Sequence, residues 1–159
     1  LETGHHLRAL DLALEEIYDV MEPHFANLGI NPSSRSPGWL LETGAPSAPN
    51  PELNPEDAVN WFKVFARQIL MVIVFLGPSR GKLEMTPFRD DVSKAYSIET
   101  MPGQMVIIRA DALMHSHTAP ETAFAVCCFY LQACTIGGAR AVDGPLAENL
   151  SPVAQYLSQ

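Results

Sequence analysis

The sequence predicts an α+β domain in which a small antiparallel β-barrel of about six strands carries two helices. An N-terminal stretch places apolar residues at steps of three and four, which is the period of an amphipathic helix. Short apolar segments separated by Gly- and Pro-containing turns follow between residues 69 and 131, as expected for a barrel. The chain of 159 residues suits one core, so we expect a single domain over 1–159.

The composition excludes several classes of protein. A net charge of -8 with only 10 basic residues opposes binding to phosphate backbones, so nucleic acid is not an expected partner. The most hydrophobic window, 69–76, is too short for a membrane-spanning helix, which needs about 20 residues. The odd count of 3 cysteines, with Cys127 and Cys128 adjacent in an apolar segment, predicts reduced core thiols.

The first predicted element is a helix over residues 4–26. Its apolar stripe consists of Leu7, Leu10, Leu14, Ile17, Met21, Phe25 and Leu28. Pro23 lacks a backbone donor and is expected to end or kink the helix at its last turn. The stripe either docks on the rest of the domain or meets another chain, and the sequence does not separate these two outcomes.

Residues 29–55 form a Pro-rich loop, in which only residues 38–43 have the character of an edge strand. A loop of this length usually covers or binds something, so we expect an interaction surface here. Asn54 is a helix-capping residue followed by Pro55 and two acidic residues, which predicts a helix over 55–68. Trp61, Phe62 and Phe65 predict that this helix is buried.

The predicted barrel covers residues 69–131. Besides the edge strand, its strands are 69–76, 82–86, 94–99, 104–110 and 123–131. The connections 77–81 and 101–104 have hairpin and turn chemistry, so neighbouring strands are expected to be antiparallel. Strands 69–76 and 123–131 are apolar at consecutive positions, which predicts helices on one face and the barrel interior on the other. Residues 132–159 are expected to form a C-terminal arm.

His115 and His117 are the candidate metal ligands, because neutral imidazole binds iron, zinc and copper. On a strand, residues two apart share a face, but this pair is placed in a turn before Pro120, where a shared face is not assured. The other interpretation is a surface or hydrogen-bonded corner without metal. No catalytic residue is predicted.

A resemblance to a known family rests on these residues. The segment 77–131 resembles the C-terminal half of the double-stranded β-helix, a jelly-roll or cupin-like fold, of iron(II) and 2-oxoglutarate dependent oxygenases, and Leu113-Met114-His115 matches their distal histidine. The resemblance implies Fe(II) at His115. The sequence departs from it in two places: no H-x-D or H-x-E occurs on an earlier strand, and residues 123–127 hold no basic side chain for the cosubstrate. No cofactor is therefore predicted.

A second likeness points to a cell compartment. Segments 67–78, 83–85 and 106–111 resemble recurring segments of a set of algal proteins that carry the same degenerate barrel. That likeness implies a chloroplast protein, peripheral to the thylakoid membrane, in an organellar and photosynthetic complex. A chain that begins at Leu1 is expected to be a processed or truncated product.

Together these observations favour a non-catalytic assembly subunit, whose partners are other protein subunits of a large, membrane-associated complex. The alternative is an Fe(II)- and 2-oxoglutarate-dependent oxygenase-like enzyme that uses His115, with His117, Asp111 or the pair His5-His6 completing the site. A third interpretation is a barrel that binds a small ligand without catalysis.

Overall fold

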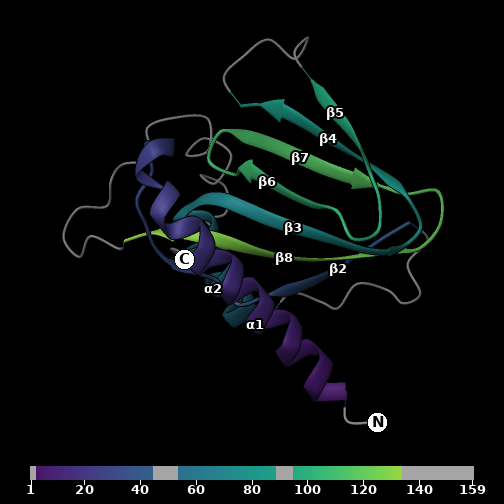
Figure 1. The fold of residues 1–159 in the computed structure, drawn as a ribbon, viewed down its shortest axis with the longest axis horizontal. Coiled ribbons are helices and arrows are strands. Elements are labelled where there is room, and N and C mark those ends of the chain that lie inside the picture. The colour runs from purple at the N-terminus through teal and green to yellow at the C-terminus, as the bar shows by residue number, and fades with distance from the viewer. Residues whose placement is uncertain (1–2, 45–53, 89–94, 134–159) are drawn as a thin grey trace.

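The computed structural model describes residues 3–44, 54–88 and 95–133 (Figure 1). The elements, in chain order, are α1 (Thr3–Met21), the 3-10 helices η1 (Glu22–His24) and η2 (Ala26–Leu28), β1 (Pro32–Arg35), β2 (Trp39–Thr43), α2 (Pro55–Phe65), β3 (Gln68–Pro78), β4 (Gly81–Pro87), β5 (Tyr96–Thr100), β6 (Met105–Arg109), β7 (Leu113–Thr118) and β8 (Ala123–Gln132). The predicted C-terminal arm lies outside the described residues, apart from its first two residues.

Helix α1 follows the predicted pattern over most of its length. Leu14 is buried, with Leu10, Ile17 and Met21 packed around the same cluster. The helix ends at Met21, and Pro23 lies in η1, as its missing backbone donor predicts. The expected stripe is wrong at its two ends, because Leu7 and Leu28 are at least half exposed.

The strands form two antiparallel sheets. In the first sheet the order is β1-β8-β3-β6, and β2 pairs with β8 beyond the end of β1. In the second sheet the order is β5-β4-β7. This arrangement confirms the predicted α+β jelly-roll fold, although the sheets are not closed into one barrel. The described residues contain eight strands instead of about six, because β1 and β7 were not predicted.

The predicted hairpins are wrong for two connections. The segment between β3 and β4, and the Pro102-Gly103 turn between β5 and β6, each link strands that belong to different sheets. Every ladder is nevertheless antiparallel, as expected. The turn residues predicted a change of chain direction but not the sheet that the next strand joins.

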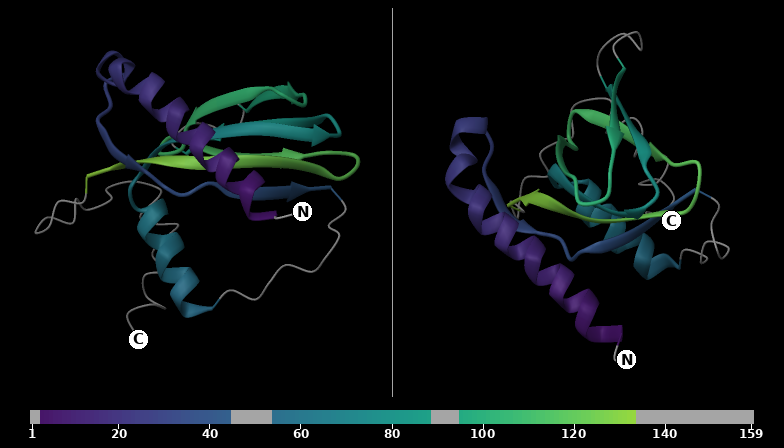
Figure 2. Two further views of the ribbon diagram at one scale, coloured as in Figure 1. Left: turned by 60° about the horizontal axis from the view of Figure 1, so that its bottom comes forward. Right: turned by 45° about the vertical axis from the view of Figure 1, so that its right-hand side comes forward.

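The central strands β3 and β8 are covered on both faces, as their consecutive apolar residues predicted. On the inner face, Phe75, Cys127 and Phe129 belong to the core between the two sheets. On the outer face, Val72 and Cys128 belong to a second cluster, with α1 packed against it. The views in Figure 2 show α1 as the outermost layer on this side.

Helix α2 packs against the inner-face cluster. Asn54 caps it as predicted, because its side-chain oxygen accepts a hydrogen bond from the Asp57 N–H at 2.8 Å. Trp61 contacts Trp39 with ring centroids 4.2 Å apart, which fixes the helix to β2. The prediction of a buried helix is wrong, since its aromatic side chains are only half-buried. Neither described helix is long and apolar enough to cross a membrane.

Candidate functional site

Strand β7 carries both predicted metal ligands on one face. His115 lies opposite Met85, and His117 lies opposite Leu83, in the antiparallel ladder with β4. Opposed residues of such a ladder share a face, and Leu83 is fully buried in the core between the sheets. The two imidazoles therefore point inward. The expectation that they lie in a turn is wrong, because the strand continues through both residues to Thr118.

His117 connects the two sheets. Its Nε2 lies 2.9 Å from Oγ1 of Thr100 on β5, and its Nδ1 lies 3.2 Å from Oγ1 of Thr43 on β2. Its ring also contacts Phe75 of β3, with centroids 4.8 Å apart. Burial lowers the pKa of His117, so the neutral imidazole is favoured. Both ring nitrogens are thus engaged with hydroxyl groups of the protein.

His115 has a different environment. Burial lowers its pKa as well, which also favours the neutral ring. Asp111, one of the residues expected to complete a metal site, instead accepts hydrogen bonds from Arg109 at 2.7 and 2.6 Å. The His5-His6 pair lies on α1, which packs on the outer face of the first sheet, whereas His115 points to the inner face. The structure therefore does not bring these residues together.

These residues do not fit a resident iron ion. Among the described residues, no group of three His, Cys, Asp or Glu side chains is placed to hold a metal. Both ring nitrogens of His117 contact Thr43 and Thr100, so its single nitrogen lone pair is directed at a threonine hydroxyl and not at a position shared with His115. Where a cosubstrate-binding base would lie on β8, Ala125 is buried in the apolar core.

The two cysteines of β8 are inert in this setting. Cys127 faces the inner cluster and Cys128 the outer one, and both are free and buried. Burial raises the pKa of the Cys127 thiol to about 12 and that of Cys128 to about 11. Thiolates, which bind metals and act as nucleophiles, are therefore disfavoured at both positions.

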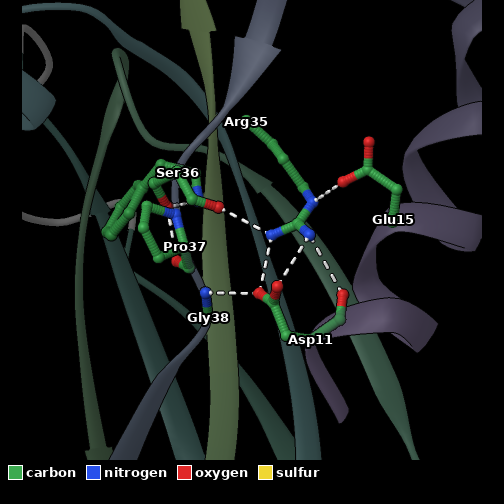
Figure 3. Close-up of polar contacts among 7 residues, drawn as sticks. Asp11, Glu15, Arg35, Ser36, Pro37 and Gly38 are labelled. Carbon is green, nitrogen blue, oxygen red and sulfur yellow. Dashed lines mark hydrogen bonds and ion pairs between the residues drawn. The ribbon is translucent and has the colours of Figure 1, made fainter. Parts of the chain in front are cut away.

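A charged cluster that the sequence did not predict lies on the opposite side of the first sheet (Figure 3). Arg35 of β1 donates from Nη1 and Nη2 to the two carboxylate oxygens of Asp11, at 2.9 and 3.2 Å, and from Nε to Glu15. It also donates to the carbonyl of Ser36 at 2.9 Å, and the Gly38 N–H donates to Asp11 at 3.0 Å. Arg35 thereby joins α1 to the β1–β2 connection.

The electrostatics of this cluster fit a structural role. The Arg35 hydrogen bond is the largest cause of the lowered pKa of Asp11, and the Asp11 hydrogen bond raises the pKa of Arg35. A shallow depression of about 490 Å³ lies above these residues. The guanidinium in it is already bound by two carboxylates and two backbone carbonyls, so little donor capacity is left for a ligand.

Comparison with known proteins gives no family. No family model matches the sequence, and no curated protein matches it. Among solved structures, a prolyl 4-hydroxylase from Phytophthora capsici is similar over 86% of this chain and 52% of that one, at 11% identity and a TM-score of 0.49. A cupin domain of an XRE-family transcriptional regulator from Enterobacter cloacae is similar over 62% and 75%, at 15% identity and a TM-score of 0.30.

A third similar structure is Drosophila melanogaster CENP-C bound to CAL1, over 39% of this chain and 46% of that one, at 12% identity and a TM-score of 0.33. This chain thus spans about half the length of the CENP-C chain and of the prolyl 4-hydroxylase chain in those structures. With TM-scores below 0.5, these likenesses carry no argument about activity. The jelly-roll fold of this chain follows from its own strand pairing, in which β3 pairs with β6 and β8, and β4 pairs with β5 and β7.

Proposed function

We propose that this chain is a non-catalytic subunit of a larger protein assembly, built on a jelly-roll domain whose inward histidines are structural. The observation that supports this most is the position of His117, whose two ring nitrogens each contact a threonine hydroxyl from a different sheet. A side chain held in this way fixes one sheet against the other. It leaves no ring nitrogen for a metal or for proton transfer to a substrate.

The surface of the N-terminal segment supports the assembly role. Between residues 3 and 28, four large apolar side chains are at least half exposed, namely Leu7, Leu12, Val20 and Leu28. Of these, Leu12 and Val20 lie on the same side of α1, and grouped exposed apolar side chains are typical of surfaces that contact another protein. We further propose, from the likeness to algal proteins, that the assembly is a photosynthetic complex in the chloroplast, peripheral to the thylakoid membrane.

The rival function, an oxygenase-like enzyme, is tested by metal binding. The purified chain is incubated anaerobically with Fe(II), freed of excess metal and analysed for iron, in parallel with His115→Ala and with His24→Ala, which changes an exposed histidine. We expect no stoichiometric iron in any of the three proteins. Stoichiometric iron in the parent and in His24→Ala, lost in His115→Ala, would establish the enzyme instead.

The assembly role is tested by the native mass of the chain in a gentle extract of its source cells. Separation on a native gel followed by peptide mass spectrometry is expected to find the chain in a complex much larger than 17.4 kDa. Isolated plastids and their thylakoid fraction, analysed in the same way, test the compartment. Migration near the mass of the free chain would contradict the assembly role, and absence from plastids would contradict only the localisation.

A further inference from the structure

The outward face of α1 carries a second apolar stripe. Ala9, Leu12, Ala13 and Val20 lie on one side of the helix, away from Leu14, and the acidic Glu16 lies among them at the same helical spacing. All five are exposed, with Leu12 at 56% and Val20 at 70%. In Figure 2 the N-terminal turns of α1 extend past the sheets. Within the described part of the chain, this stripe has no apolar partner.

The charges of α1 are segregated along its axis. Residues 3–10 contain His5, His6 and Arg8 and no acid, whereas the charged residues of 11–21 are all acids, namely Asp11, Glu15, Glu16 and Asp19. The first turn has no acidic residue and the last turn has no basic residue. This order opposes the helix dipole, which favours acids near the N-terminus and bases near the C-terminus. An isolated α1 is therefore electrostatically disfavoured by its own sequence.

The unfavourable order of charges in α1 is offset when the α1 of a second copy packs against it in the antiparallel direction. The acidic half of each helix then lies beside the basic half of the other, and the two dipoles oppose each other. Arg8 and Asp19 are eleven positions apart, which is about three helical turns, so both lie on the same flank of the stripe. With a two-fold axis that crosses the helix between positions 13 and 14, Arg8 of one copy comes beside Asp19 of the second copy.

We propose that two copies of this chain associate through the Leu12 face of α1, with the helices antiparallel. The inference rests on the proposed function, because it names a partner for a surface that the assembly role left open. A contact between two helices of this length is smaller than a standard interface of about 1,600 Å². The dimer is therefore weak, with a Kd between about 1 µM and about 1 mM.

Sedimentation velocity of the purified full chain over this concentration range tests the proposal. The parent chain is expected to shift from monomer to dimer as its concentration rises, and Leu12→Glu is expected to remain monomeric. Ala26→Glu, which introduces the same charge at an exposed position of η2 outside α1, is the matched control and should dimerise like the parent.

A charge exchange tests the antiparallel arrangement itself. Arg8→Glu is expected to weaken dimerisation at least about tenfold, because the new acid lies beside Asp19 of the second copy. Asp19→Arg is expected to weaken it similarly. The double variant Arg8→Glu/Asp19→Arg restores opposite charges across the two-fold axis and should recover most of the parent affinity. Such recovery occurs only where both residues meet across one self-complementary contact.

The remaining outcomes each overturn the dimer. A parent chain that stays monomeric at every concentration rejects it, whether α1 then binds a different protein or a part of its own chain. Dimerisation that Leu12→Glu leaves intact places the contact elsewhere. A monomeric purified chain that nevertheless migrates in a large complex in the native extract rejects the dimer but keeps the proposed function, so the two failures are distinguishable.

Discussion

At the scale of single residues, the inner histidines behave as part of the core. Burial lowers the pKa of His115 and of His117 below the usual value of 6.5. The unfolded chain therefore takes up protons at these positions more readily than the folded chain as the pH falls. Their contribution to stability is complete above the unfolded pKa, near 6.5, and is lost as the pH falls through the folded values.

This linkage predicts acid sensitivity that depends on His115. Thermal unfolding of the purified chain, followed by circular dichroism at about pH 8 and about pH 5, should give a lower Tm at the acidic pH. His115→Met replaces the titratable ring opposite Met85 by an apolar side chain that cannot take up a proton, so in this variant the difference between the two Tm values should shrink. His24→Gln, at an exposed position, should keep the parent difference. An unchanged difference in His115→Met would contradict the attribution of the acid sensitivity to His115.

Tyr130 is a second informative residue. It is fully buried between Tyr18 and Phe25, with ring centroids 4.9 and 5.5 Å away, and its hydroxyl has no hydrogen-bond partner among the described residues. A buried unpaired hydroxyl costs about 1–3 kcal/mol of desolvation. Most substitutions in a core lower the free energy of unfolding, but removal of this hydroxyl should not.

Tyr130→Phe should leave the free energy of unfolding unchanged or raise it by about 1 kcal/mol, because the ring stays and the unpaired hydroxyl is removed. Urea unfolding of the two proteins measures the difference. Tyr18→Phe is the matched control, since Tyr18 is only half-buried, and it should stay within about 0.5 kcal/mol of the parent. A loss above about 1 kcal/mol in Tyr130→Phe would reveal a partner for this hydroxyl.

Residue patterns in the sequence explain which parts of the site could be predicted. The L-x-H pattern identified His115 and His117 as unusual, but their environment depends on Thr43 and Thr100, which are 74 and 17 residues away from His117. Such contacts arise from strand register, which no local pattern encodes. Arg35 was missed because it lies among Ser and Pro residues, where its partner on α1 leaves no local signal.

At the scale of secondary-structure elements, α1 is held to the sheet by two kinds of contact. Its apolar stripe packs on the outer face of β3 and β8, and Arg35 binds Asp11 and Glu15. The Arg35 side chain is 11% exposed, whereas Asp11 and Glu15 are 46% and 52% exposed. Asp11 also accepts from the Gly38 N–H, so it fixes the β1–β2 connection together with the helix.

The two carboxylates should therefore contribute unequally to stability. Asp11→Ala is expected to lower the free energy of unfolding by about 1–2 kcal/mol, because it leaves a largely buried guanidinium and the Gly38 N–H without their acceptor. Glu15→Ala removes a single exposed contact and should cost less than about 1 kcal/mol. Urea unfolding of both variants measures the two values. Equal losses would mean that the bond to Gly38 adds nothing.

The elements also show why strand type was easier to predict than strand pairing. The apolar runs that become β3 and β8 identify themselves by length and composition. In strand β7 the inward residues Leu113, His115 and His117 alternate with exposed ones. Two of the three inward residues are histidines, so the strand lacks the apolar-polar alternation by which a strand is usually predicted. The predicted turn 101–104 lies between β5 and β6 as expected, whereas Gly77 and Pro78 of the predicted connection 77–81 belong to β3, and Gly81 belongs to β4. The turn residues did not indicate that the chain passes from one sheet to the other.

At the scale of the whole molecule, the two sheets differ in how well they are covered. The first sheet has the inner core on one face and α1 on the other. The second sheet shares the inner core, but its outer face exposes Lys82, Glu84, Ser97 and Glu99, with Met114 at 58%. Local opening is easiest where fewer apolar contacts must be broken.

This asymmetry predicts a gradient of amide protection across the molecule. In native-state hydrogen exchange of the dilute purified chain, the amides of β3 and β8 should exchange most slowly, because these central strands are paired on both sides and covered on both faces. The amides of β5 and β7, which end the second sheet, should exchange faster. In His117→Ala, the loss of the contacts to Thr43 and Thr100 should accelerate exchange in β5 and β7 more than in β3. A uniform acceleration across both sheets would instead mean that they unfold as a single cooperative unit.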